Sequence, residues 1–230
     1  MKVVILQPSY IPWRGYFDQI FTADLFVFYD DVQYDKRGWR NRNRIKTSAG
    51  PLWLTIPVFN RGAQTEHIPI NQIKIVWDRP WNQEHWNSIR MAYSKAPYYQ
   101  KYAGLVEGMY STKPEMLADF TIETTILLAR TIGIDRTRFM RSSEIEGVEG
   151  IKTDRLLSIL AKVGATEYYS GPSASDYIES EKFDNAGIKL HYMKYDYLEY
   201  PQLYPPFDPQ VSILDTMFMM GEEALKTIRR

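Results

Sequence analysis

The chain has 230 residues, with 28 lysines and arginines balanced by 28 aspartates and glutamates, and no cysteine. This length accommodates one large domain or two small ones, and an apolar share of 44% excludes a disordered chain. Without cysteine there can be no disulfide, thiolate nucleophile or cysteine metal site. The longest apolar run, Leu25–Tyr29, is far shorter than the roughly 20 residues of a membrane-spanning helix. No secretory signal is visible, so we expect a cytoplasmic protein without a membrane span.

Short apolar segments in the first third of the chain predict buried strands separated by polar loops. The expected strands are 3–6, 25–29, 52–58 and 73–76, and the spacing of apolar residues predicts a helix over 15–23. Between about 80 and 132 the period becomes helical. One helix should end before Ala96-Pro97, a second should cover 98–110, and a third should run from Pro114 to Gly133.

The last hundred residues alternate again between the two kinds of element. We expect strands over 138–141, 167–170 and 188–193, and helices over 154–163 and 211–228. This alternation predicts a mainly parallel sheet with helices packed on it. No linker is apparent, so we treat residues 1–230 as a single α/β domain with a helical insertion at about 80–132.

Polar residues follow several of the predicted strands. Ligands of open parallel sheets bind beyond the carboxyl ends of the strands, so these residues are candidates for a common site. Each motif alone is also explained as an ordinary turn, because Ser, Pro, Gly and Asp favour turns. The motifs are Gln7-Pro8-Ser9-Tyr10, Asp30-Asp31-Val32-Gln33, Ser142-Ser143 and Ser170-Gly171-Pro172-Ser173.

The segment Lys36–Lys46 carries six basic residues and no acidic one. The rest of the chain has 22 basic and 28 acidic residues and is therefore net negative. A local positive excess on an acidic body indicates an anionic ligand, and a pI near 6.8 makes nucleic acid an unlikely general partner. Arginine binds phosphate with two prongs, asparagine both donates and accepts, and Trp39 offers a flat face. The alternative is a solvated loop whose charges pair with the acidic remainder.

Candidates for proton transfer are few. The chain has three histidines, and His85 is the best candidate for a general base, although a histidine near Trp81 is more often structural. Asp30 is the second candidate. Asp30 and Asp31 could hold magnesium only if a loop turned both toward one ion, so we predict no metal site. The tyrosines of residues 192–204 either pack over an edge of the sheet or line a sugar or acyl pocket.

The sequence resembles the WbqC-like protein family of bacteria across almost its whole length. The resemblance rests on residues 7–17 (Gln-Pro-Ser-Tyr-Ile-Pro-Trp-Arg-Gly-Tyr-Phe), on 30–34, on Trp39 with 41–46, and on 53–58. It continues with His85, Tyr93, 96–98, 153–156, and 169–173 with Tyr177. The resemblance implies an enzyme of surface-polysaccharide or O-antigen assembly, with transfer of an aminoacyl group such as glycyl to an amino sugar.

Together, residues and resemblance predict a Rossmann-like α/β enzyme that transfers an acyl group to the amine of a nucleotide-activated sugar. The basic segment would hold diphosphate or the phosphopantetheine arm of a thioester donor, which a carrier protein or CoA would supply. Trp13 and Trp39 would pack on a ring, His85 or Asp30 would accept a proton, and the turn at Ser170-Gly171 would stabilise an oxyanion. The expected substrate-binding residues are Gln7, Tyr10, Trp13, Asp31, Gln33, Lys36, Trp39, Asn41, Arg42, Asn43, Lys46, Ser170, Gly171, Ser173 and Tyr177.

Two other classes of function fit the same residues. One is magnesium-dependent nucleotidyl transfer, with Asp30 and Asp31 on the ion and the basic segment on a triphosphate. The other is a non-catalytic module that binds a nucleotide, RNA or a carrier protein. These classes differ in their dependence on metal and on salt.

Overall fold

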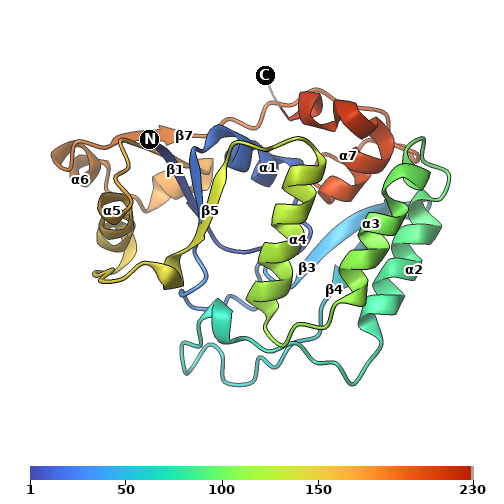
Figure 1. Ribbon diagram of the computed structural model, residues 1–230, viewed down its shortest axis with the longest axis horizontal. Helices are drawn as coiled ribbons and strands as arrows, with labels where there is room; N and C mark the ends of the chain where they lie inside the picture. The colour runs from blue at the N-terminus through green and yellow to red at the C-terminus, as the bar shows by residue number, and fades with distance from the viewer. Residues whose placement is uncertain (229–230) are drawn as a thin grey trace.

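A five-stranded parallel sheet forms the centre of the structure, a computed structural model that describes residues 1–228 (Figure 1). Arg229 and Arg230, the end of the predicted domain, lie outside the described residues. The strands lie in the order β5-β2-β1-β6-β7, and every neighbouring pair is parallel. Their bounds are β1 (Lys2–Leu6), β2 (Leu25–Phe28), β5 (Arg138–Arg141), β6 (Glu167–Ser170) and β7 (Lys189–Tyr192).

Both faces of this sheet are covered by helices, which explains why β1 and β2 are apolar at nearly every position. Val4 and Phe26 face a core with α1 (Arg14–Thr22) and α7 (Ile213–Met220), whereas Val3 faces a second core with α5 (Lys152–Lys162) and α6 (Ser180–Asn185). Figure 1 shows α5 and α6 on one side of the sheet and α1 and α7 on the other. The predicted mainly parallel, Rossmann-like sheet is confirmed.

The connection from β2 to β5 contains two strands and three α-helices that lie outside the central sheet, together with one short 3-10 helix. β3 (Arg42–Thr47) and β4 (Gly50–Thr55) form an antiparallel hairpin, and α2 (Trp81–Tyr93), α3 (Tyr99–Ser111) and α4 (Leu117–Thr131) pack beside it (Figure 1). The three helices occupy the segment where helices are predicted. Four short 3-10 helices complete the elements of the described residues 1–228: η1 (Ile70–Gln72), η2 (Ser142–Glu144), η3 (Pro172–Asp176) and η4 (Gly221–Thr227).

Three sequence predictions about individual elements are wrong. The strand expected over 52–58 exists as β4, but it pairs with the basic segment, in which no strand was expected, and not with the parallel sheet. The segment 73–76 makes only isolated bridges, to Val58 and to Met116. The closing helix ends at Met220 because Gly221 adopts a positive φ of 58°, where a Cβ atom would collide with the Tyr98 ring.

The topology indicates where a ligand would bind. The strand order reverses between β1 and β6: the two strands are neighbours, but the chain continues from β1 to β2 on one side and from β6 to β7 on the other. In doubly wound sheets this switch point is where ligands bind. Among residues 1–228, no helix combines the length and apolar character needed to cross a bilayer.

Candidate functional site

A cleft of about 540 Å³ opens at the carboxyl ends of β1 and β6, at the switch point of the sheet. Its volume lies within the range of small-molecule sites. The walls come from five segments: the end of β1 and the loop after it with α1, the start of the hairpin, the turn after β6, the tyrosine-rich segment (residues 192–204), and Gln210 before α7. The lining residues are Leu6, Ser9, Pro12, Trp13, Tyr16, Gln19, Trp39, Arg40, Asn43, Gly171, Pro172, Ser173, Tyr195 and Gln210.

Aromatic rings form much of the wall. Trp13 and Tyr195 meet edge to face with ring centroids 5.0 Å apart, and Trp39 lines the cleft from the hairpin side. The Trp13 indole lies against Gly15 of α1, where any Cβ atom would collide with it. Glycine at position 15 therefore lets the Trp13 ring pack on the first turn of α1.

Arg40 is the cation of the cleft. One terminal nitrogen donates to the Pro8 carbonyl at 3.3 Å, whereas its Nε is buried and has no hydrogen-bond partner within residues 1–228. No carboxylate of this described part of the chain forms an ion pair with it. Burial lowers the pKa of Arg40, while Tyr16 and Asp35 act in the opposite direction. A guanidinium stays protonated at neutral pH, so Arg40, which has no carboxylate in ion-pair contact, suits an anionic ligand.

Gln19 offers the complementary group, an unused acceptor. Its amide nitrogen donates to the Tyr195 hydroxyl at 2.8 Å, and its buried Oε1 has no partner among the described residues. Burial raises the pKa of Tyr195, so this hydroxyl remains protonated and can donate to a ligand. The cleft therefore combines one unpaired cation with uncharged donors and acceptors on an aromatic wall.

Asn43 shapes the loop that follows β1. Its Nδ2 donates to the carbonyls of Tyr10 at 3.1 Å and Ile11 at 2.9 Å, and its Oδ1 accepts the Arg44 backbone N–H at 2.8 Å. Ile11 is fully buried and has a φ of 34°, an unfavourable conformation for a β-branched residue. Asn43 thus stabilises a strained loop in addition to lining the cleft.

His85 lies behind this loop and does not line the cleft. Its Nδ1 is 2.8 Å from the Tyr10 hydroxyl, which is in turn 2.5 Å from the Tyr110 hydroxyl, and all three side chains are buried. Burial lowers the pKa of His85 to about 4, although a backbone hydrogen bond with Thr55 opposes the shift. The ring is neutral at pH 7, and its Nδ1 is engaged in the hydrogen bond with Tyr10. This environment favours the structural interpretation, and the predicted role as general base stays untested.

Asp30 and Asp31 form a separate cluster at the carboxyl ends of β2 and β5. Asp30 is fully buried and accepts hydrogen bonds from the Ser142 hydroxyl and from the backbone and hydroxyl of Ser143, at 2.8–3.2 Å. Asp31 accepts from Ser142 at 2.6 Å and pairs with Arg155 at 2.5 Å. These contacts occupy oxygens that a magnesium ion would need, and the described residues contain no group of three acidic or histidine side chains that could hold a metal.

The residues of the basic segment point in different directions, and only some of them reach the cleft. Only Trp39, Arg40 and Asn43 of this segment line the cleft. The Arg42 guanidinium lies 4.9 Å from the centroid of Trp53, and Arg44 pairs with Asp208 at 3.3 Å. Of the remaining predicted residues, Asn41 donates to the Ile56 carbonyl, Lys46 donates to the Pro206 carbonyl, and Lys36 is exposed.

The other predicted residues also separate into those at the cleft and those elsewhere. Trp13, Gly171 and Ser173 line it. The Gln7 carbonyl accepts from Tyr16, Ser170 is buried beside the Tyr168 hydroxyl, and Gln33 and Tyr177 are exposed. Arg40, Gln19 and Tyr195 were not predicted as site residues. For Arg40 and Tyr195 a signal existed, the basic segment and the tyrosine cluster, whereas Gln19 lies in a helix without any motif.

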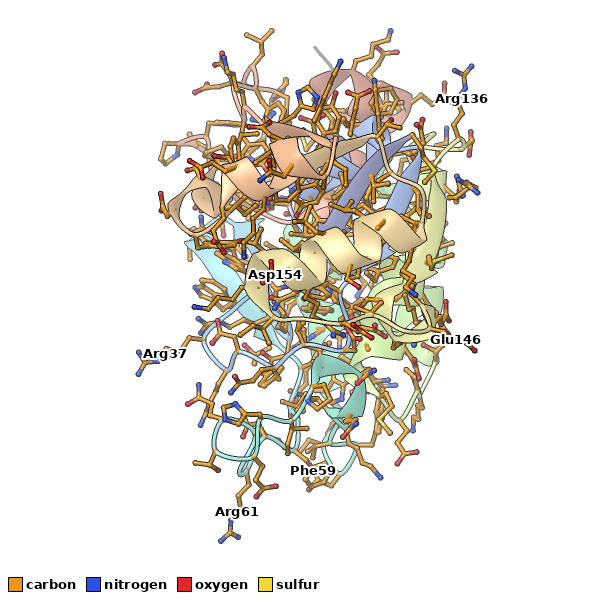
Figure 2. The ribbon with its side chains drawn as sticks, turned by 90° about the vertical axis from the view of Figure 1, so that its left-hand side faces the viewer. Arg37, Phe59, Arg61, Arg136, Glu146 and Asp154 are labelled. Carbon is orange, nitrogen blue, oxygen red and sulfur yellow. The ribbon has the colours of Figure 1, made fainter. Side chains whose placement is uncertain are left out.

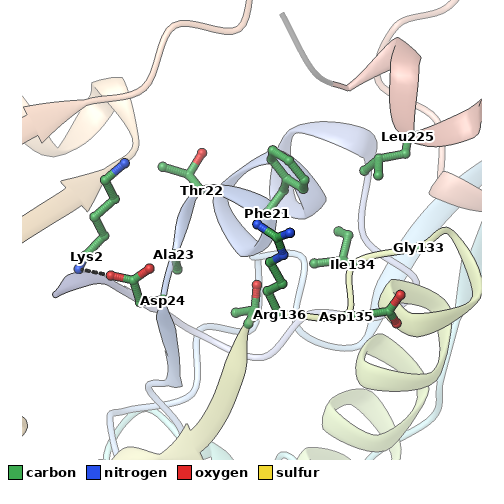
Figure 3. Close-up of a pocket in the computed structure, with 11 residues that line it drawn as sticks. Lys2, Phe21, Thr22, Ala23, Asp24, Gly133, Ile134, Asp135, Arg136 and Leu225 are labelled. Atoms are coloured by element: carbon green, nitrogen blue, oxygen red, sulfur yellow. Dashed lines mark hydrogen bonds between the residues drawn. The ribbon is translucent and has the colours of Figure 1, made fainter.

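A second cavity of about 520 Å³ lies at the opposite edge of the sheet, beside the amino ends of β1, β2 and β5 (Figure 3). Its charges are of both signs, Lys2 and Arg136 with Asp24 and Asp135, and Asp24 accepts the Lys2 backbone N–H at 2.7 Å. Because parallel sheets bind ligands beyond their carboxyl ends, we assign the candidate site to the cleft at β1 and β6.

Comparisons with known proteins identify one family and one similar protein. The family model described as WbqC-like protein family matches residues 7–227. The chain is 40% identical over 230 residues to an uncharacterized protein of Mycobacterium tuberculosis (strain ATCC 25618 / H37Rv), covering 99% of this chain and 97% of the relative. No solved structure matches the chain. The matched segment includes all the lining residues of the cleft except Leu6, and the protein belongs to the WbqC-like protein family.

Proposed function

We propose that the protein transfers an acyl group, of the aminoacyl class such as glycyl, to the amine of a nucleotide-activated sugar in bacterial surface-polysaccharide or O-antigen assembly. The observation that carries the proposal is the unpaired Arg40 guanidinium in an aromatic cleft at the switch point. A sugar diphosphate supplies the missing negative charge, and a two-pronged guanidinium suits phosphate oxygens. Membership of the WbqC-like family supports the same class of substrate.

The uncharged groups of the cleft suit the sugar. Gln19 Oε1 can accept a hydrogen bond from a sugar hydroxyl or amine, and Ser9 and Ser173 add hydroxyl groups nearby. Trp13 gives the ring of the sugar an apolar face to pack on. These neutral side chains are what a polar, uncharged sugar requires, since an anion would need further cations.

The reaction would be direct acyl transfer. The neutral amine attacks the carbonyl carbon of a thioester, the C–N bond forms, and the C–S bond breaks as the thiolate leaves with a proton from the amine. The Tyr195 hydroxyl is a protonated donor in the cleft and could stabilise the oxyanion that develops on the carbonyl. No covalent enzyme intermediate is needed, in keeping with a chain that has no cysteine. The donor is a phosphopantetheine thioester on a carrier protein or on CoA.

The proposal is tested by binding and by transfer. Isothermal titration with UDP-glucosamine should show binding without magnesium, and Arg40→Gln should weaken it roughly 10- to 100-fold, as expected for a charged hydrogen-bonded contact. Arg136→Gln is the matched control, because Arg136 is an exposed arginine at the opposite edge of the sheet (Figures 2 and 3). Mass spectrometry should then detect a glycyl adduct of the sugar with glycyl-pantetheine as donor.

Two results would contradict the proposal. One is equal affinity of the wild type and Arg40→Gln for UDP-glucosamine. The other is stabilisation by nucleoside triphosphates only in the presence of magnesium, which would favour nucleotidyl transfer.

A further inference from the structure

At the mouth of the cleft, two exposed tryptophans lie against each other. Trp39 and Trp53 have ring centroids 5.1 Å apart with an interplanar angle of 31°, and they are 40% and 44% exposed. Trp39 also lines the cleft, so the pair continues the aromatic wall onto the surface. Large exposed aromatic side chains on a soluble protein commonly mark a binding surface.

The hairpin adds positive charge to this surface. Arg44 is the register partner of Trp53, and Arg42 lies two residues before it on the same face of β3, so both guanidiniums approach the Trp53 ring. Arg44 is neutralised by Asp208. Within residues 1–228, neither Arg42 nor the exposed Lys36 and Arg37 forms an ion pair, and Arg37 extends away from the body of the protein (Figure 2).

We propose that Trp39, Trp53 and Arg42, here called the tryptophan platform, form a nucleobase subsite at the mouth of the cleft. The proposal rests on the proposed function, since it places the nucleotide half of a nucleotide-activated sugar. Base rings of every kind stack on exposed aromatic side chains, and the surrounding cations complement the phosphates attached to the base. The chain itself thus provides both the ring contact and the charge that a nucleotide requires.

The order of the wall residues gives the ligand a direction. Trp39 belongs to both the platform and the cleft, and Arg40 follows it directly in the chain. The phosphates, which join the nucleoside to the sugar, would lie at Arg40. The base then stacks outside on the tryptophan platform, and the sugar lies inside among Gln19, Gly171 and Tyr195.

The test separates base from phosphate. Uridine 5′-monophosphate and ribose 5-phosphate are titrated against the wild type and against Trp53→Ala, with folding checked by circular dichroism. We expect the variant to bind uridine 5′-monophosphate roughly 5- to 150-fold more weakly, the usual range for one base–aromatic stack, and ribose 5-phosphate with unchanged affinity. Trp53→Phe should restore part of the loss because it keeps an aromatic face. Phe59→Ala, which removes an aromatic ring that is 63% exposed but outside the platform, should change neither affinity.

Equal losses for both probes, or no loss for uridine 5′-monophosphate, would overturn the subsite. Tighter binding of an oligothymidylate than of the mononucleotide, with a steep salt dependence, would replace it by single-stranded nucleic acid binding. The subsite and the proposed function can fail separately. Base-dependent binding that needs Trp53 supports the subsite even if no acyl transfer is detected, and transfer that is unaffected by Trp53→Ala contradicts only the subsite.

Discussion

Replacing Asn43 with alanine should destabilise the protein and loosen the cleft. The variant removes both hydrogen bonds to the carbonyls of Tyr10 and Ile11 and the bond that accepts the Arg44 N–H. Tyr10 and Ile11 are fully buried, so their carbonyls lose a partner that protein atoms do not replace. The strained conformation of Ile11, with its positive φ, then loses a contact that stabilises it.

The size of the effect follows from these contacts. Each buried polar group left unsatisfied costs about 1–3 kcal/mol. Three groups are affected, and the neighbouring cleft can supply water to some of them, so we expect a loss of about 3–5 kcal/mol in the free energy of unfolding. Relaxation at Ile11 would return part of its strain energy, about 1–3 kcal/mol, and would move the loop that carries Ser9 and Trp13. Affinity for UDP-glucosamine should therefore fall at least roughly tenfold, as for the loss of about 1.4 kcal/mol.

Urea unfolding followed by circular dichroism measures the loss of stability, and titration measures the affinity. Asn41→Ala is the matched control, because Asn41 lies on the same segment and donates to one carbonyl, that of Ile56, at 2.8 Å. It should cost about 1–3 kcal/mol and leave the affinity unchanged. If Asn43→Ala costs no more than Asn41→Ala, or if its affinity is that of the wild type, then Asn43 does not hold the loop.

Two other variants test His85, which lies behind the cleft, and Gly171, which lines it. Burial lowers the pKa of His85 to about 4 in the folded state, from about 6.5 in the unfolded chain. Between pH 6.5 and pH 4 the unfolded state therefore binds a proton that the folded state does not. The free energy of unfolding should fall over this range as the pH is lowered, by at most roughly 3 kcal/mol. His85→Gln should flatten that part of the curve of unfolding free energy against pH, and a loss of turnover by 10²-fold or more without loss of stability would instead identify a general base. At Gly171, where φ is −67°, an alanine Cβ would lie 3.5 Å from the Tyr195 hydroxyl. Gly171→Ala should therefore keep the melting temperature of the wild type while reducing sugar binding in the titration, and unchanged binding would place the sugar elsewhere.

The parallel sheet could be predicted from the sequence because its strands are buried on both faces. Segments such as Val3–Leu6 and Leu25–Phe28 are then apolar without interruption, and the turns that follow them are polar. The first strand of the hairpin, β3, could not be predicted in the same way. Arg42 and Arg44 alternate with Asn43 and Ile45, and a strand with a charged outer face and an asparagine on its inner face has no continuous apolar signal.

The sequence predicts a site at the carboxyl edge of the parallel sheet, and the structure distributes the predicted residues over the cleft and other places. Parallel strands bring Gln7, Asp30, Ser142 and Ser170 to one edge, yet strand order decides which of them share a cleft. Asp30 follows β2 and meets Ser142 after β5, whereas the cleft lies between β1 and β6. The positions of Gln19 and Tyr195 depend on how α1 and the tyrosine-rich segment pack, which local sequence patterns do not specify.

The origin of the cleft walls bears on how relatives should be compared. Leu6 at the end of β1 lines the cleft, but Trp39, Arg40 and Asn43 come from the long connection between β2 and β5, which lies outside the parallel sheet. Substitutions there could exchange one recognised molecule for another while the scaffold stays intact. When a ligand is assigned to one relative from another, sequence identity at residues 36–58 should therefore count for more than identity averaged along the whole polypeptide.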